Sequence, residues 1–183
     1  METLTDNALM LKVKDGDLDR MSLLYERYHK QLYGFLFRMS REKELSEDMV
    51  QNVFFKMLKY RKGFAGSGEF KTWMYHIARN ILYDHFRKEK RNSSNLKIKD
   101  IEEKTAGGEL ADARLEKSQE LKTLQIALDK LSEENRELLI LFRFQELKHA
   151  EISRILNISE GAVKVRVHRA LNELKSIYLK IEN

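Results

Sequence analysis

The chain has 183 residues, 42% of them hydrophobic and 34% charged, which fits one or two small domains and excludes a large barrel. It has no cysteine, which excludes disulfides, thiol catalysis and zinc–thiolate sites. It also has no proline and only eight glycines, so we expect an all-α fold. Its 34 Lys and Arg exceed its 29 Asp and Glu by five, so any nucleic-acid surface depends on how charge is distributed.

The sequence predicts a cytoplasmic protein with no membrane span. Residues 1–17 contain acids and no long apolar run, unlike a secretory signal peptide. No stretch approaches the roughly 18 apolar residues that a spanning helix needs.

Helical periodicity dominates the N-terminal half. Thr5 or Asp6 is placed to cap a short helix that Gly16 would end. Asp17 would cap a longer helix with apolar residues three or four positions apart, at Met21, Leu24, Tyr28, Leu32, Phe35 and Met39. Ser46 is the predicted cap of the next helix, whose buried face holds Met49, Val53 and Leu58.

A glycine-rich loop and a linker follow. Residues 62–70 hold three of the eight glycines and predict a loop, after which a long helix runs from Phe70 to about Lys90. Residues 92–118 lack apolar periodicity and carry five basic and six acidic residues, which predicts a flexible linker with local helix near its end. We therefore expect two small helical domains, 1–91 and 119–183, joined by the linker 92–118.

Periodicity returns after the linker, first at Leu121, Leu124, Leu128 and Leu131. Ser132 is the predicted cap of the next helix, whose apolar face holds Leu138, Leu141 and Phe142. After a break near Glu146, two short helices are predicted at about 149–156 and 160–178. Asn157 would take the left-handed position between them and Ser159 would cap the second.

These last two helices form a predicted helix-turn-helix, because the second is basic. Its inner face would hold Ile152, Ile155, Ile158, Val163, Val167, Ala170 and Leu174. Lys164, Val165 and His168 would then point outward, flanked by Arg166 and Arg169. Such a helix suits a major groove, with outward residues on base edges and arginines on phosphates. The alternative is an ordinary bundle with a solvated basic face.

The predicted helix 70–91 mixes cations with aromatic rings. Trp73, Ile77, Ile81 and Phe86 have core spacing, and a second set lies at other angles: Lys71, Tyr75, His76, Arg79, Asn80, Arg87, Lys88, Lys90 and Arg91. Rings among cations suit single-stranded nucleic acid, because rings stack on bases while cations hold the backbone. The glycine-rich loop could close over an unstacked base. The alternative is that Trp73 and Tyr75 belong to the core and the basic end is solvated.

Three strings, in this order, resemble the extracytoplasmic-function (ECF) sigma factors of bacterial RNA polymerase, in the sigma-70 family. SEDMVQNVFFKML (46–58) is similar to the helix with which that family binds core polymerase. FKTWMYHIARN (70–80) resembles its promoter-melting and −10 element helix. ISEGAVKVRVHRAL (158–171) resembles its −35 recognition helix. With the flanking periodicity, the resemblance covers nearly the whole chain outside the linker.

The resemblance implies a sigma factor that binds core RNA polymerase, at the clamp of its largest subunit and at its flap, and directs initiation at promoter DNA. It implies an anti-sigma factor as a further partner and no cofactor or metal. Region 2 (1–91) would capture the unwound −10 strand and region 4 (119–183) would read the −35 duplex. An extended linker could reach roughly 90 Å, and the two promoter elements lie roughly 70 Å apart.

The site residues implied by the resemblance fall into three groups. Core polymerase would meet Asp48, Gln51, Asn52 and Phe54. The −10 strand would meet Phe64, Ala65, Gly66, Ser67, Lys71, Trp73, Tyr75, His76, Arg79, Asn80 and Arg87, with Phe64, the residues after it and Asn80 around a flipped base. The −35 duplex would meet Ser159, Gly161, Lys164, Val165, Arg166, His168 and Arg169.

The chain departs from the family pattern at several of these positions. Ala65 and His76 stand where Arg is common, Asn52 replaces a usual acid, and Lys148 stands where Ser or Thr often caps the first helix of the helix-turn-helix. Val165 replaces a frequent Ser or Thr, and an apolar reader favours a thymine methyl group.

Two other interpretations of the sequence stay open. A stand-alone helix-turn-helix regulator, with 1–91 as a sensing or dimerisation domain, would leave the basic–aromatic helix unexplained. An enzyme could place a metal on His76, Asn80 and Asp84, which share a helical face. Asn is a weak ligand, the surroundings are basic, and the loop GFAGSG lacks the Lys-Ser/Thr of a P-loop. We therefore expect a binding protein and not an enzyme.

Overall fold

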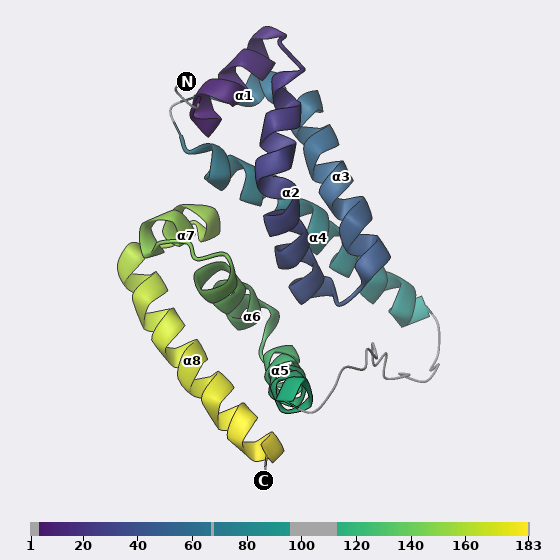
Figure 1. Cartoon of the computed structure of the whole chain (residues 1–183), viewed down its shortest axis with the longest axis vertical. Coiled ribbons are helices and arrows are strands. Elements are labelled where there is room, and N and C mark those ends of the chain that lie inside the picture. The colour runs from purple at the N-terminus through teal and green to yellow at the C-terminus, as the bar shows by residue number, and fades with distance from the viewer. Residues whose placement is uncertain (1–3, 67, 96–112, 183) are drawn as a thin grey trace.

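The computed structural model describes residues 4–66, 68–95 and 113–182, with side chains outside 93–118. Within these ranges the chain forms helices and no strand, in the order α1 (Asp6–Asp15), α2 (Arg20–Ser40), α3 (Lys43–Lys59), α4 (Phe70–Asn95), α5 (Ala113–Asp129), α6 (Glu133–Leu139), α7 (His149–Leu156) and α8 (Glu160–Glu182). Figure 1 shows two groups, α1–α4 and α5–α8, packed against each other. The all-α prediction is confirmed.

The N-terminal helices follow the predicted apolar stripe. Thr5 caps α1 by accepting a hydrogen bond from the amide of Ala8 at 3.3 Å, and Gly16 ends it with a φ of 114°, where only glycine is unstrained. All six predicted core positions of α2 are buried, and so are Met49 and Val53 of α3. The stripe works because one helical face meets α3 and α4 while the other meets water.

Two predicted caps are wrong. Asp19, not Asp17, precedes α2, because residues 17–19 form an extra turn in which the carboxylate of Asp17 accepts a hydrogen bond from Arg20 at 2.9 Å. Glu42, not Ser46, precedes α3. Ser46 is buried inside the helix, where its hydroxyl donates to the carbonyl of Glu42 at 2.5 Å, a local bond that serine makes as readily as a cap.

The predicted loop and long helix are present. A 3-10 turn (Arg61–Gly63) leads into the loop, and α4 begins at Phe70 as predicted. It continues to Asn95, so the first residues assigned to the linker are helical, and α5 already begins at Ala113. Residues 96–112 of the predicted linker lie outside the described part of the chain.

The C-terminal half matches its predicted caps. Ser132 accepts from the amide of Asn135 at 3.3 Å, Asn157 has the left-handed φ of 54°, and Ser159 accepts from the amide of Ala162 at 3.1 Å. Lys148 precedes α7. The cap is made by Glu151, whose carboxylate accepts a hydrogen bond from the amide of Lys148 at 2.8 Å. The expected leucine face of α5 is only partly buried, because Leu121 is 61% exposed while Leu128 and Leu131 are buried.

A π-helical segment (Ile140–Phe144) interrupts the path from α6 to the helix-turn-helix. The amide of Gln145 bonds to the carbonyl of Ile140 at 3.0 Å, five residues back, so the turn is wider than an α-helical turn. Glu146 follows with a φ of 53°. This widened turn places Phe144 beside Arg38 and Gln145 beside Tyr75, both in the N-terminal group.

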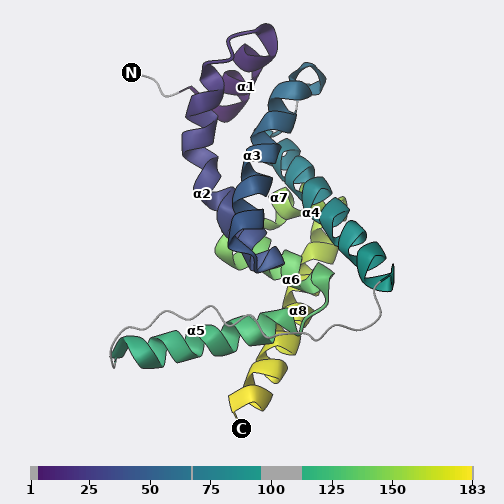
Figure 2. The same ribbon diagram turned by 90° about the vertical axis from the view of Figure 1, so that its right-hand side faces the viewer.

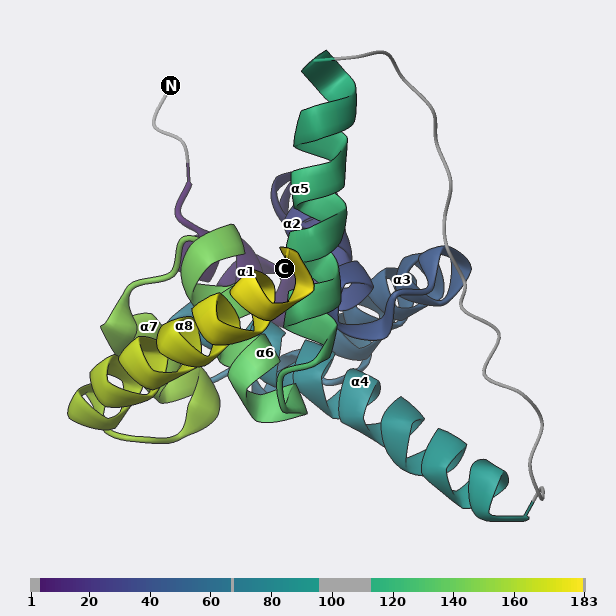
Figure 3. The ribbon, with the colours of Figure 1, turned by 90° about the horizontal axis from the view of Figure 1, so that it is seen from below.

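One buried apolar cluster joins both helical groups, running from α1–α4 into Leu138, Ile140, Leu141 and the helix-turn-helix. A second, smaller cluster lies between α5, α6 and α8, around Leu128, Leu131, Leu139 and Ala170. Figure 2 shows α6 and α7 behind α2–α4, and Figure 3 shows the end of α4 projecting away from α5–α8. Among the described residues, each helix is too short or too polar to cross a membrane.

Candidate nucleic-acid interface

The helix-turn-helix is built by α7 and α8. Ile152, Ile155, Val163, Val167 and Ala170 form its buried face, and Ile158 and Leu174 are half-buried at its margins. The left-handed Asn157 ends α7, and the amide of Ile158 bonds back to the carbonyl of Ser153 at 3.0 Å. The serine cap then starts α8 at a fixed angle, so the residues opposite the core are turned to solvent.

The outward residues of α8 are those predicted from the sequence. Lys164, Val165, Arg166, His168 and Arg169 are exposed, with Val165 at 50%. Lys164 pairs with Glu160, one turn back at 3.4 Å, and both side chains are more than half exposed, so the pair is weak. A Cβ on Gly161 would meet nothing within 4 Å, which leaves the start of the helix open. A duplex can approach this face.

A hollow of about 570 Å³ lies between the glycine-rich loop and the first half of α4. Its lining residues come from the loop and the start of α4, with one residue each from α1 and α7: Asn7, Gly63, Phe64, Ala65, Gly68, Glu69, Thr72, Trp73, His76 and Arg154. The ring of Phe64 is buried and tilted against Trp73, at 5.2 Å between centroids. This volume is within the range of pockets that bind small ligands, and it can hold a planar ring such as a nucleic-acid base.

Helix α1 holds this loop in place, which the sequence pattern did not reveal. Asn7 donates to the carbonyl of Gly68 at 2.9 Å and accepts from the amide of Phe70 at 2.8 Å. Lys14 donates to the carbonyl of Phe64 at 2.6 Å. Gly66 has a φ of 73°, and a Cβ there would meet Leu11 at 2.9 Å. The loop is therefore fixed at three points by one short helix.

The remaining predicted −10 residues differ in how far they are exposed and in whether they line the hollow. Tyr75 is buried with its edge on Phe35, at 5.5 Å between centroids, so its ring has no free face in this arrangement. Asn80 is exposed but does not line the hollow, and Arg87 pairs with Asp84. Lys71 is half-buried and Ser67 lies outside the described residues.

Charge at the centre of α4 is set by burial and by neighbours. Burial and the nearby Arg79 lower the pKa of His76, so its imidazole is neutral at pH 7. Burial opposes the charge of Arg79, but the hydrogen bond and the charge of Glu137 outweigh it and raise the pKa of Arg79. Burial and Glu137 together raise the pKa of Tyr83.

The predicted polymerase-binding residues lie on α3. Asp48, Gln51 and Asn52 are exposed, whereas Phe54 is buried with its ring edge-on to Tyr25 at 4.9 Å. The neighbouring Phe55 is 63% exposed and was missed. The sequence could have indicated it, because Phe55 is a large apolar residue that does not fall on the apolar stripe of its helix. A groove of about 450 Å³ lies between α2 and α3, lined by Tyr25, His29, Lys30, Tyr33, Glu47, Val50 and Gln51.

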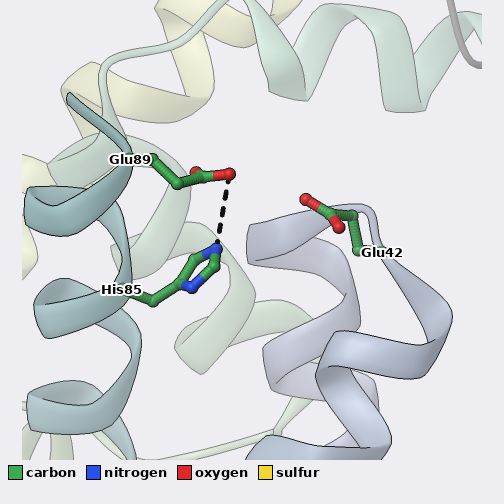
Figure 4. A group of neighbouring side chains, drawn as sticks. All are labelled: Glu42, His85 and Glu89. Carbon is green, nitrogen blue, oxygen red and sulfur yellow. Dashed lines mark ion pairs between the residues drawn. The ribbon is translucent and has the colours of Figure 1, made fainter. Parts of the chain in front are cut away.

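The three residues weighed as a metal set do not come together. Asp84 pairs with Arg87, while His76 faces the hollow. Another set of metal-type side chains does converge: Glu42 before α3 faces His85 and Glu89 of α4, with ligand atoms within 4.8 Å of one another (Figure 4). Nε2 of His85 lies 3.4 Å from the Glu89 carboxylate. Both glutamates are exposed, as in a surface ion pair.

Comparison with known proteins agrees with this geometry. The family model for sigma-70 region 2 matches residues 24–92, and that for sigma-70 region 4 matches residues 121–174. The ECF RNA polymerase sigma factor SigX of Bacillus subtilis is 30% identical over 163 residues, covering 86% of this chain and 82% of SigX. The ECF RNA polymerase sigma-E factor of Haemophilus influenzae is 30% identical over 176 residues, covering 92% and 93%.

Solved structures show the same fold. The sigma factor RpoE of Bartonella quintana, in complex with the anti-sigma factor NepR, is 25% identical with a TM-score of 0.66, covering 88% of this chain and 98% of RpoE. CnrH, in complex with the cytosolic domain of CnrY, has a TM-score of 0.74 at 22% identity, covering 97% and 99%. Both sigma-70 family models match this chain, and two ECF sigma factors are 30% identical to it over most of their length. The chain therefore belongs to the ECF sigma factors of the sigma-70 family.

Proposed function

We propose that this sigma factor reads its promoter through two separate surfaces, one in residues 1–91 and one in 119–183. It directs promoter-specific initiation with core RNA polymerase, and a sigma factor is not an enzyme. In residues 119–183, Lys164, Val165 and His168 face the bases of the −35 duplex while Arg166 and Arg169 hold phosphates. The observation that carries this assignment is their shared exposure on the outer face of α8.

The −10 strand binds at the hollow beside the loop. The hollow has room for a flipped base, lies between a rigidly held loop and α4, and has Trp73 in its wall. Lys71, Arg79 and Arg87 lie along the same helix to hold the backbone of a single strand. Phe64 acts by packing behind Trp73, because its own ring is buried.

Core polymerase binds the groove between α2 and α3. Gln51 lines that groove, and Asp48, Asn52 and the exposed ring of Phe55 lie on the same helix. An exposed phenylalanine among polar residues is typical of an interface centre. The protein acts in the cytoplasm, where polymerase and promoter meet, and an anti-sigma protein covers these faces when the factor is inactive. A complex of that kind is known for the Bartonella quintana relative.

Run-off transcription from a promoter library, with purified core polymerase, tests the proposal. Defined start sites should appear only with the protein, and Lys164→Ala should lower their yield without moving the −10 preference. Lys175→Ala, on the same helix and also exposed, is the matched control and should have little effect. Binding to a palindromic duplex without initiation would instead support a stand-alone regulator.

A further inference from the structure

The two domains meet through opposite charges. Four ion pairs place an acid of residues 119–183 on a cation of residues 1–91: Glu137 on Arg79 at 2.6 Å, Glu133 on Lys90 at 3.3 Å, Asp129 on Arg41 at 3.4 Å, and Glu151 on Lys71 at 3.8 Å. Three of the cations, those at 71, 79 and 90, belong to the basic–aromatic helix.

Arg79 is the centre of this contact. Its Nε and Nη2 donate to the two carboxylate oxygens of Glu137, at 2.6 and 3.1 Å, and its Nη1 donates to the carbonyl of Ile155 at 3.1 Å. Tyr83 donates to the same carboxylate at 2.9 Å. Glu137 is only 2% exposed, so this is a buried anion held by three hydrogen bonds. A two-oxygen anion on an arginine fork is also the geometry of arginine with phosphate.

The buried apolar cluster and three further polar contacts complete the boundary. Tyr75 donates to Gln145 at 3.0 Å, and the guanidinium of Arg38 lies 4.4 Å from the ring centre of Phe144. Arg154 pairs with Glu69 at 2.6 Å on the edge of the hollow that would take a base. Lys164, Val165, His168 and Arg169 of α8 have no part in these contacts and stay exposed, whereas Arg166, also exposed, lines a hollow of about 420 Å³ with Arg79 and Glu137.

We propose that the free chain inhibits itself by this closed arrangement, in which Glu137 occupies the place of a −10 strand phosphate on Arg79. The proposal rests on the assignment of α4 to the −10 strand. Nε and Nη2 of Arg79, the fork that would hold a phosphate at two points, both donate to Glu137, so a DNA phosphate can bind that fork only by displacing Glu137. Reading both promoter elements requires surfaces roughly 70 Å apart, whereas in the closed arrangement Arg154 of the helix-turn-helix lines the −10 hollow itself. The block is selective, because the −35 helix remains free to meet duplex DNA.

Energy transfer within the full chain tests the closure directly. Because the chain contains no cysteine, dyes can be placed at Glu44→Cys and Ser176→Cys, both exposed positions, one in each domain. Glu137→Gln keeps the shape of the side chain and removes its charge, and Tyr83→Phe removes one donor. Glu134→Gln, exposed on the same helix, is the matched control. The DNA probe is a mixed-sequence single-stranded 20-mer.

Transfer should be high in the wild type at low salt, fall in Glu137→Gln, fall less in Tyr83→Phe, and stay high in Glu134→Gln. If the open state is populated at about 1–10%, opening should tighten single-strand binding by roughly 10- to 100-fold. Binding to mixed-sequence duplex should change little. Circular dichroism checks that each variant is folded. Salt at about 0.5 M should lower transfer in the wild-type chain, because it screens the more exposed pairs of Arg41, Lys71 and Lys90.

Unchanged energy transfer in Glu137→Gln would overturn the closure. If Glu137→Gln does not fold, unchanged transfer both in Tyr83→Phe and in the wild type at high salt would overturn it. Lower transfer without tighter single-strand binding would overturn the inhibition. Failure of run-off transcription in a chain that opens and closes as expected would refute only the assignment of promoter reading.

Discussion

Asn7 offers the sharpest test of how the hollow is built. Its side-chain amide bonds the loop at Gly68 and the first amide of α4 at Phe70, at 2.9 and 2.8 Å. A hydrogen bond of this kind contributes about 0.5–1.5 kcal/mol net. Asn7→Ala removes both, so we expect the free energy of unfolding to fall by roughly 1–3 kcal/mol. Asn7→Asp keeps an acceptor for Phe70 and loses only the donor to Gly68, so about half the loss should remain.

The assay is urea unfolding followed by the fluorescence of Trp73. This is the only tryptophan of the chain and it stands in the wall of the hollow, so it reports both unfolding and local loosening. Single-strand DNA affinity measured on the same samples should fall in the order wild type, aspartate, alanine. Equal stability of all three proteins would refute the bracing role, and so would an aspartate variant as unstable as the alanine variant.

Three further predictions concern the other surfaces. Val165→Ser should weaken binding to −35 duplexes with thymine at the contacted position more than to duplexes lacking it, and equal binding across a thymine-substituted series would contradict the methyl contact. Phe55→Ala should weaken core-polymerase binding about tenfold or more with little change in the free energy of unfolding, because the ring is 63% exposed; a loss of stability without a loss of binding would show a structural role. Because burial and Arg79 lower the pKa of His76 from its ordinary value of 6.5, only the unfolded chain gains this proton as the pH falls through that value. Stability should therefore drop between pH 7.5 and 5.5, and less so in His76→Gln; the same slope in both proteins would exclude His76 as its source.

Local sequence signals predicted the helices and most of their ends. The six apolar positions of α2 are all buried, and Thr5, Gly16, Ser132, Asn157 and Ser159 stand where their side chains or backbone are needed. Such features depend on residues within one or two turns, so a sequence pattern carries them. Ser46 failed because a serine inside a helix and a serine at its start leave the same local pattern.

The contacts that shape the site are distant in sequence and could not be predicted from it. Asn7 meets residues 61 and 63 positions away, and Glu137 meets Arg79 at a separation of 58. Nothing near Glu137 marks it as buried, since its helix begins with two other glutamates. Tyr75 has the spacing of a possible base-stacking residue, but its burial depends on Phe35 of another helix.

The widened turn at Ile140–Phe144 sets the phase between α6 and the helices that follow. Each residue of an α-helix turns the chain by about 100° around the helix axis. Removing the extra residue of the widened turn would therefore rotate every later residue by about 100° relative to α6. Gln145 would then leave Tyr75, and Phe144 would leave Arg38, while the recognition helix would keep its own fold. Insertions or deletions of a single residue here should therefore alter how the two halves of the protein recognise each other. A change of equal size within the glycine-rich loop would instead alter the shape of one pocket.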